Sequence, residues 1–306
     1  MRLAQALLTL AVVVTIVFVL VRLIPGNPVE TILGTDITPE AEQALRAQLG
    51  LDEPIAAQLV DYATGLGHGD LGTSAVQQGV PVTSIIANAL PITLALAGSG
   101  LVLGAFLGIA LGLWAALTRH RKVDVAIRSW AMLQYATPTF LVALVLILIF
   151  AVTLNWLPAG GWPASYPENL TYLALPAFAL ASHLAPAVAR TARQAALDIS
   201  GQSFIEASLA RGLPRWRLNL FHVFPNALLP VVNLLAVNFG GLLTGAIIVE
   251  AVFGIVGLGT ELNRAVTGRD YPVVVGIALV SAAAVIVANM LGDIATALID
   301  PRARRT

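Results

Sequence analysis

Residues 91–117 read PITLALAGSGLVLGAFLGIALGLWAAL, a stretch without a charged side chain. A helix needs about 20 apolar residues to cross the roughly 30 Å of hydrocarbon in a bilayer, because it rises only about 1.5 Å per residue. This stretch is therefore long enough to span a membrane. Across the whole chain of 306 residues, 58% are hydrophobic, 11% are charged and the mean hydropathy is +0.84. Such a composition predicts an integral membrane protein rather than a soluble domain.

Five more long stretches also lack charged residues, and together with residues 91–117 they predict an all-α membrane protein with six transmembrane helices. They cover residues 3–21, 130–154, 170–188, 227–249 and 272–291. The first stretch has a second interpretation, a cleaved secretory signal. However, its long apolar run continues into Arg22 and Leu23 without a small-residue cleavage site, which favours a retained helix.

The positive charges predict on which side of the membrane each loop lies. An even number of spans places both termini on the same side, and thirteen of the seventeen lysines and arginines fall on that side. The other side has Arg22, Arg46, Arg264 and Arg269. Because positively charged loops are retained in the cytoplasm, both termini are predicted to be cytoplasmic.

The six stretches divide the chain into three predicted parts. Residues 1–24 contain the first transmembrane helix, residues 25–90 form an extracytoplasmic insert, and residues 91–306 form a core with five transmembrane helices. Within the insert, Thr38 and Pro39 predict the start of one short helix. A second short helix is predicted from residue 54 to residue 64, and the glycines that follow it indicate turns.

The inventory of residues excludes several classes of site. The single lysine, Lys122, is not preceded by glycine, so the chain has no P-loop of the form GxxxxGK[ST], and another chain must bind any ATP that is used. There is no cysteine, and the four histidines lack the spacing of a metal site. A formal net charge of zero gives nucleic acid no electrostatic attraction to this chain.

Residues 200–226, between the fourth and fifth predicted spans, have the pattern of a rigid helix–turn–helix. Ser203 and Glu206 have the spacing of a capping box, Gly212 can end the first helix in the left-handed conformation, and Pro214 suits the first turn of a second helix. One interpretation is that the loop docks into a groove on a soluble partner. In the other, it rests on lipid headgroups through Arg211, Arg215, Arg217 and Trp216.

A resemblance favours the docking interpretation. Glu206-Ala207-Ser208, followed by Gly212 and Pro225, resembles the EAA loop of bacterial ABC importer permeases. The whole chain is similar to the first permease of the oligopeptide/dipeptide/nickel family, because matching motifs follow one another from the first span to the C-terminus. They are RLIPGNP at 22–28, GLDxP at 50–54, GDLGxS at 69–74, ATPxF at 136–140, RxxR at 190–193, PNAxxP at 225–230, GLG at 257–259, DYP at 270–272 and DPR at 300–302.

The resemblance implies the type I architecture of ABC importers, in which this chain pairs with a homologous second permease in the bacterial inner membrane. It also implies two cytoplasmic ATPase subunits, which carry ATP and Mg and bind the EAA loops, and an extracytoplasmic binding protein that delivers substrate. The chain itself is then a non-catalytic subunit without a cofactor. Peptides are the expected cargo, and nickel, glutathione, haem or oligosaccharides are the alternatives within the family.

By the same resemblance, contacts to the ATPase carry over to seven residues of the loop: Phe204, Glu206, Ala207, Ser208, Arg211, Gly212 and Pro214. Three positions depart from the family pattern. Phe204 stands where tyrosine is common, which puts a hydroxyl contact to the ATPase in doubt. Arg211 replaces a lysine and keeps its charge, and Val256 replaces a proline before the GLG motif.

Polar side chains inside apolar spans are costly, so they usually face a bundle interior or a water-filled cavity. The candidates for a translocation path are Gln134, Thr137, His183, Asn233, Asn238, Asn289 and Asp293. The alternative role for each of them is an ordinary hydrogen bond between helices. Pro138, Pro176 and Pro186 remove backbone donors and are expected to kink or open the third and fourth spans.

Two other classes of membrane protein fit the sequence less well. An ion-coupled transporter usually needs ionisable groups near the bilayer midplane, and none of the six stretches contains Asp, Glu, Lys or Arg. An intramembrane enzyme needs a nucleophile with a base, or a set of metal ligands, and the sequence gives no convergent group of His, Asp and Glu.

Overall fold

The structure is a computed structural model that describes residues 2–23, 52–77, 79–118, 121–163 and 167–299, together with residues 38, 40, 43 and 46. Within these ranges the regular secondary structure is helical, apart from one isolated bridge between Thr73 and Pro81, so the predicted all-α fold is confirmed. The chain divides into two compact units. Unit 1 comprises Met1–Thr93 and Val256–Ile286, and unit 2 comprises Leu94–Ile255 and Val287–Thr306.

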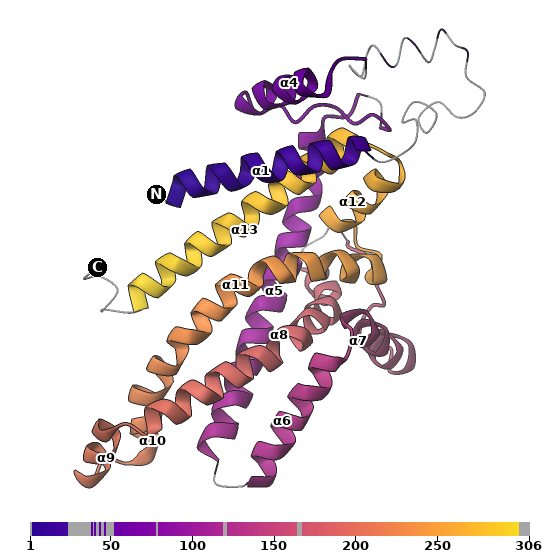
Figure 1. The fold of residues 1–306 in the computed structure, drawn as a ribbon. Helices are drawn as coiled ribbons and strands as arrows, with labels where there is room; N and C mark the ends of the chain where they lie inside the picture. Colours follow the sequence, from indigo (N-terminus) through magenta and orange to yellow (C-terminus); the bar gives the residue numbers. More distant parts are fainter. Residues whose placement is uncertain are drawn as a thin grey trace. The chain divides into compact units, whose positions relative to one another are not determined.

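Unit 1 contains α1 (Arg2–Leu23), α4 (Ile55–Gly67), the beginning of α5 (Val82–Leu117), α12 (Leu258–Thr267) and the beginning of α13 (Tyr271–Ile299) (Figure 1). Phe18 of α1 and Val275 of α13 are buried in one cluster, and the ring of Tyr62 of α4 lies 5.8 Å from that of Phe18. A second cluster joins the start of α5 to α12 and α13 through Val82 and Ile277. The removal of these apolar side chains from water holds the helices of unit 1 together.

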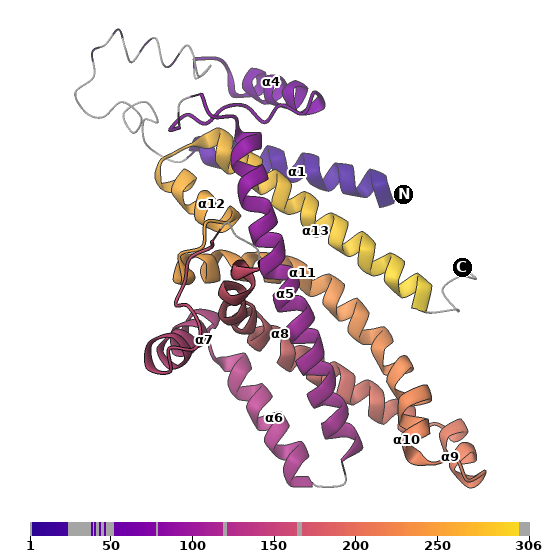
Figure 2. The same cartoon turned by 180° about the vertical axis from the view of Figure 1, so that it is seen from behind.

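Unit 2 is built around α8 (Glu168–Ser200), which contacts α6 (Arg121–Ala136), α7 (Thr139–Leu146) and α11 (Phe224–Phe253). Its shorter elements are the helices α9 (Ser203–Ala210) and α10 (Arg215–Leu218) and the π-helical segments η1 (Ile147–Thr153) and η2 (Asn219–Val223). Figures 1 and 2 show α8 crossing the part of α5 that belongs to this unit. α8 buries a row of small side chains, among them Ala181, Ala185 and Ala189, because its neighbours approach it closely.

Several of the described helices are long and apolar enough to cross a membrane. They are Val82–Leu117, Glu168–Ser200, Arg215–Phe253 and Tyr271–Leu298, and α6 together with Thr139–Thr153 makes another if the bent pair is one span. α1 occupies the first predicted stretch and has an apolar part at Leu8–Leu20. The protein is therefore a multi-pass membrane protein, whereas the count of six spans and the cytoplasmic position of both termini stay predictions.

The third predicted span, residues 130–154, is broken rather than continuous, as the expected effect of Pro138 implies. α6 ends at Ala136 and α7 begins at Thr139, and the two directions differ by 105°. Pro138 explains the break, because proline lacks a backbone donor and disfavours helical geometry in the residue before it. Pro176 and Pro186, by contrast, lie inside α8 without interrupting it. Of the three prolines expected to kink or open a span, Pro138 alone breaks its helix.

The described part of the predicted insert contains the second expected helix. Pro54 is the N-cap of α4, which continues to Gly67, beyond the predicted end at residue 64. The helix expected after Thr38 falls largely outside the described residues. α5 begins at Val82, so the predicted limit of the insert at residue 90 lies inside a helix that Pro91 does not interrupt. The limits of the three predicted parts stay predictions.

Candidate functional site

The predicted helix–turn–helix is present at one end of unit 2. α8 ends at Ser200, α9 and α10 follow after short connections, and η2 leads directly into α11. The seven residues predicted to contact an ATPase are brought together here. Phe204, Glu206, Ala207 and Ser208 lie in α9, Arg211 is its C-cap, Gly212 follows, and Pro214 is the N-cap of α10.

A small hydrophobic core anchors this loop to the two long helices beside it. Ile205 of α9, Leu218 of α10 and Val223 of η2 are buried together with Ile199 of α8 and Ala227 of α11. Each buried side chain of this size stabilises the packing by about 1.5–3 kcal/mol. The loop is therefore a packed extension of α8 and α11.

A Schellman motif ends α9, the hydrogen-bond pattern that closes a helix when the next residue is left-handed. The N–H of Leu213 donates to the carbonyl of Ser208 at 3.2 Å, and the N–H of Gly212 donates to the carbonyl of Leu209 at 2.9 Å. Gly212 has a φ of +83°, which confirms the predicted left-handed position. A residue with a side chain is strained at this φ even though the space around it is open.

The start of α9 differs from the prediction. Gln202, rather than Ser203, is the N-cap, and no side-chain hydrogen bond caps the helix. The predicted capping box of Ser203 and Glu206 is therefore wrong, because the backbone becomes helical one residue earlier than that pattern requires. Glu206 is exposed, and within the described residues it forms no ion pair. Pro214 is likewise the N-cap of α10, with a ψ of 141°, rather than a residue of its first turn.

The outward face of the loop carries aromatic side chains beside charges. Phe204 is 42% exposed and Trp216 is 60% exposed. The ring of Phe204 meets that of His222 edge-on with centroids 6.3 Å apart, and the guanidinium of Arg217 lies 5.4 Å from the ring centre of Trp216. Exposed aromatic groups among charged ones are typical of a surface that binds another protein.

In unit 1, two of the sequence motifs meet although 196 residues separate them. Asp270, from the DYP motif, is 4% exposed, and its carboxylate accepts a short hydrogen bond from the hydroxyl of Ser74, in the GDLGxS motif. The same carboxylate accepts the backbone N–H groups of Ala75 at 3.1 Å and Val76 at 3.3 Å. The buried charge is thus satisfied by three donors from one segment, as a buried carboxylate requires.

The segment held by Asp270 is a compact turn. Gly72 has a φ of +82°, and its carbonyl accepts the N–H of Val82 at 2.9 Å. The N–H of Ser74 donates to the carbonyl of Val80 at 2.9 Å. The hydroxyl of Thr93 accepts the N–H of Leu258 at 2.8 Å, at the start of α12, so the GLG motif also lies at a capped helix end.

Several of the polar candidates for a translocation path have local partners within the described residues. Asn233 accepts a hydrogen bond of 2.7 Å from Thr296, Asn238 donates to the carbonyl of Leu234, and Thr137 donates to the carbonyl of Leu133. The ring of His183 lies 6.3 Å from that of Tyr135. None of the seven lines either of the two cavities of about 490 and 230 Å³ that the described residues of unit 2 form. A role in the path therefore stays a prediction for all seven.

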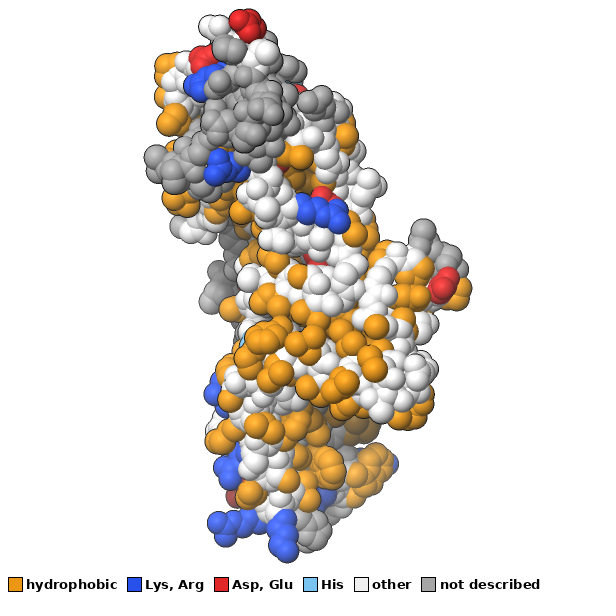
Figure 3. Space-filling model, turned by 90° about the vertical axis from the view of Figure 1, so that its right-hand side faces the viewer, with side chains coloured by type: hydrophobic (Ala, Val, Ile, Leu, Met, Phe, Trp, Pro, Cys, Tyr) orange, Lys and Arg blue, Asp and Glu red, His pale blue; other side chains and the backbone are white. Residues whose placement is uncertain are grey.

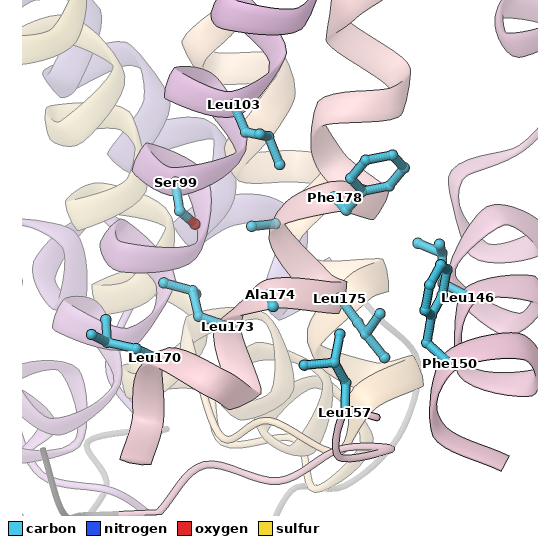
Figure 4. Close-up of a pocket in the computed structure, with 11 residues that line it drawn as sticks. Ser99, Leu103, Leu146, Phe150, Leu157, Leu170, Leu173, Ala174, Leu175 and Phe178 are labelled. Atoms are coloured by element: carbon cyan, nitrogen blue, oxygen red, sulfur yellow. The ribbon is translucent and has the colours of Figure 1, made fainter. Parts of the chain in front are cut away.

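An apolar cavity of about 490 Å³ lies between α5, α8 and the α7–η1 segment of unit 2 (Figure 4). Leu103, Phe150, Leu173 and Phe178 are among its lining residues, and Ser99 contributes its one hydroxyl. That hydroxyl already donates to the carbonyl of Leu96 at 2.9 Å. Its described lining is otherwise hydrocarbon and includes no charged side chain that would recognise a charged solute.

The sequence matches known protein families over most of its length. Residues 108–305 match the family described as the binding-protein-dependent transport system inner membrane component. Residues 1–97 match the N-terminal part of membrane components from such systems. The chain belongs to this family. It is the permease subunit of an ABC importer, as the sequence motifs indicated.

Relatives of this permease align over almost its whole length. It is 36% identical to a putative peptide permease of Brucella suis. The alignment runs over 312 residues and covers 100% of this chain and 98% of the relative. It is 34% identical over 303 residues to the oligopeptide transport system permease protein OppB of Haemophilus influenzae, with 99% of this chain and 97% of that protein covered. An inward-facing structure of the MetNI methionine ABC transporter has a TM-score of 0.60 at 20% identity over 71% of this chain and 96% of that one, which shows the shared fold.

One feature of the permease was not predicted from the sequence, a row of glycines on α5 that faces α8. A Cβ added at Gly108 would lie 2.5 Å from the Cβ of Val188, and one at Gly112 would lie 2.4 Å from the carbonyl oxygen of Ala189. Gly100 and Gly104 meet α8 in the same way. Glycines four residues apart in an apolar helix are a known signal of close helix packing, so the spacing within residues 100–112 would have predicted this contact.

Proposed function

We propose that this permease imports peptides across the bacterial inner membrane. The full-length similarity to peptide and oligopeptide permeases supports peptides as the cargo. Nickel, glutathione, haem and oligosaccharides are the alternative cargoes. In the proposed assembly the chain pairs with a homologous second permease, receives substrate from an extracytoplasmic binding protein and contacts two cytoplasmic ATPase subunits, which bind ATP and Mg.

The observation that supports this mechanism is the combination of a buried inner face and an exposed outer face in the α9–α10 loop. Ile205 and Leu218 fix the loop to α8 and α11, while Phe204, Glu206 and Trp216 are exposed. A partner that displaces the outer face must therefore move the two long helices with it, because packed cores transmit displacement rather than absorb it. When the ATPases close on ATP, this displacement would shift the helix bundle from its inward-facing to its outward-facing state.

The proposed contacts to the ATPase are Phe204, Glu206, Ala207, Ser208, Arg211, Gly212 and Pro214. Phe204 supplies an apolar contact, and Glu206 and Arg211 supply charges of opposite sign on one short helix. Gly212 and Pro214 fix the angle between α9 and α10. The polar residues Gln134, Thr137, His183, Asn233, Asn238, Asn289 and Asp293 remain the proposed candidates for the translocation path.

Gly212→Val tests the coupling role of the loop. Valine at a φ of +83° is strained by about 1–2 kcal/mol, so the turn is expected to shift and to misalign α9. We expect peptide uptake by whole cells and ATPase activity of the reconstituted complex to fall to background. Less ATPase should also be recovered when the tagged permease is purified, while membrane insertion remains intact.

Gly212→Asn is the matched control, because asparagine tolerates the left-handed conformation far better than valine. It should retain most of the uptake and most of the bound ATPase. If Gly212→Val leaves uptake, ATPase activity and recovery of the ATPase at the wild-type level, the loop is not the coupling element. If both variants lose all three properties, the change of side chain rather than the turn is responsible.

A further inference from the structure

A cavity of about 230 Å³ lies between α5, α6 and α8, separate from the α9–α10 loop. Its floor is apolar and buried, and is formed by Gly112 and Ala115 of α5 and by Pro186 and Ala189 of α8. Its polar lining includes three arginines: Arg128 of α6, and Arg190 and Arg193 of α8. The cavity thus combines an apolar floor with positive charge.

The arginines of the cavity are only partly neutralised by the protein. The guanidinium of Arg193 makes two hydrogen bonds to the carboxylate of Asp124, at 2.7 and 3.0 Å, and Arg128 lies 3.7 Å from the same carboxylate. Arg190 has no carboxylate within salt-bridge distance among the described residues, and its guanidinium lies 5.9 Å from the ring centre of Tyr135. Three positive charges therefore share one negative charge.

Exposed apolar side chains continue the cavity outward along α6. Met132, which lines it, is 74% exposed, and Tyr135 is 56% exposed. On the face of unit 2 drawn in Figure 3, a broad zone of hydrophobic side chains adjoins a group of Lys and Arg side chains. A small soluble anion would neutralise the arginines but leave Met132 in water. A ligand with both an anionic group and hydrocarbon would satisfy both parts of the site.

We propose that this cavity binds the headgroup of an anionic phospholipid. The phosphate contacts Arg128 and Arg190, Arg193 stays paired with Asp124, and the acyl chains run over Met132 and the neighbouring apolar surface. Basic cavities between transmembrane helices on the cytoplasmic side suit such headgroups, and the predicted orientation places the start of α6 and the end of α8 on that side. A lipid bound there would bridge α6 and α8, the helix that leads into α9.

The test measures retention of phosphatidylglycerol by the assembled transporter, purified in detergent and examined by native mass spectrometry. Phosphatidylcholine with the same acyl chains is the reference lipid. Arg128→Gln and Arg190→Gln should each weaken phosphatidylglycerol binding about fivefold, the usual effect of one cation near an anionic headgroup, and the double variant should lose more. The matched control, Arg121→Gln with Lys122→Gln, removes two exposed cations at the start of α6 outside the cavity and should leave retention unchanged.

Asp124→Asn provides a test in the opposite direction, because it removes the carboxylate that competes for Arg128 and Arg193. It should raise the retention of phosphatidylglycerol. Equal retention of phosphatidylglycerol and phosphatidylcholine by the wild type would overturn the proposal, as would an unchanged or lower retention in Asp124→Asn. If inorganic phosphate binds as tightly as phosphatidylglycerol, the acyl chains contribute nothing, the site is a soluble-anion site and the assignment to phospholipid is wrong.

Discussion

Two helices of this permease end with the same hydrogen-bond pattern but with different residues at the turn. After α9, Gly212 has a φ of +83°, and after α12, Arg269 has a φ of +53°. In the second case the N–H of Asp270 donates to the carbonyl of Ala265 at 2.8 Å, as the N–H of Leu213 donates to that of Ser208 in the first. Glycine adopts this backbone conformation without strain, whereas arginine does not.

The surroundings of the two turns explain the difference. The space where a Cβ of Gly212 would lie is open, and Leu213 after it packs against the core that anchors the loop. The residue after Arg269 is Asp270, whose carboxylate is held by Ser74, Ala75 and Val76. A strained residue persists where the contacts around it determine the structure more strongly than its own preference. The turn after α12 therefore keeps a strained residue because the contacts of Asp270 compensate for it, whereas the turn after α9 has glycine and carries no such strain.

Asp270→Ala should have the largest effect, because it removes the contacts that determine the turn after α12. The substitution leaves the buried hydroxyl of Ser74 and two backbone N–H groups without their acceptor, and stranding such groups costs about 1–3 kcal/mol each. We expect a loss of about 3 kcal/mol or more in the stability of unit 1. The measurements are thermal unfolding of the purified complex and the rate of proteolysis within residues 70–82.

Asp70→Ala is the control for this prediction. Asp70 is an exposed carboxylate in the same segment and accepts one hydrogen bond, from the N–H of Gly72 at 2.8 Å. Its removal should cost less than about 1 kcal/mol, since water can replace the lost acceptor. Equal effects of the two substitutions would mean that the network around Asp270 does not fix the segment.

The same contrast separates what could be predicted from the sequence from what could not. The spans, Gly212 and the break at Pro138 depend on composition and on local backbone preference, which a single sequence carries. The contact of Asp270 with Ser74 depends on tertiary packing between distant segments. The sequence therefore contains both motifs but does not predict that they contact each other. The capping box failed although Ser203 and Glu206 have the right spacing, because Gln202 is the N-cap and α9 begins one residue earlier than that spacing requires.

Glu206→Gln should have an intermediate effect, confined to the docking loop. Glu206 is exposed and caps nothing, so the stability of the permease should not change. If the carboxylate pairs with a cation on the ATPase, loss of its charge should weaken recovery of the ATPase about two- to fivefold, as is usual for an exposed ion pair. The effect should shrink as salt is added, because ions screen exposed charges. A weakening that does not depend on salt would show that Glu206 acts through hydrogen bonding or packing instead.

Replacement of Arg269 should have the smallest effect, and it isolates the strain in the turn after α12. Arg269→Gly and Arg269→Ala both remove the guanidinium, so they differ chiefly in how well the new residue adopts a φ of +53°. The glycine variant should be more stable than the alanine variant by about 1 kcal/mol, the usual cost of the left-handed conformation for a residue with a Cβ. Thermal unfolding of the two purified complexes measures this difference. Equal stabilities would mean that the turn relaxes when the arginine is removed, and the contacts of Asp270 would then not be what holds it in place.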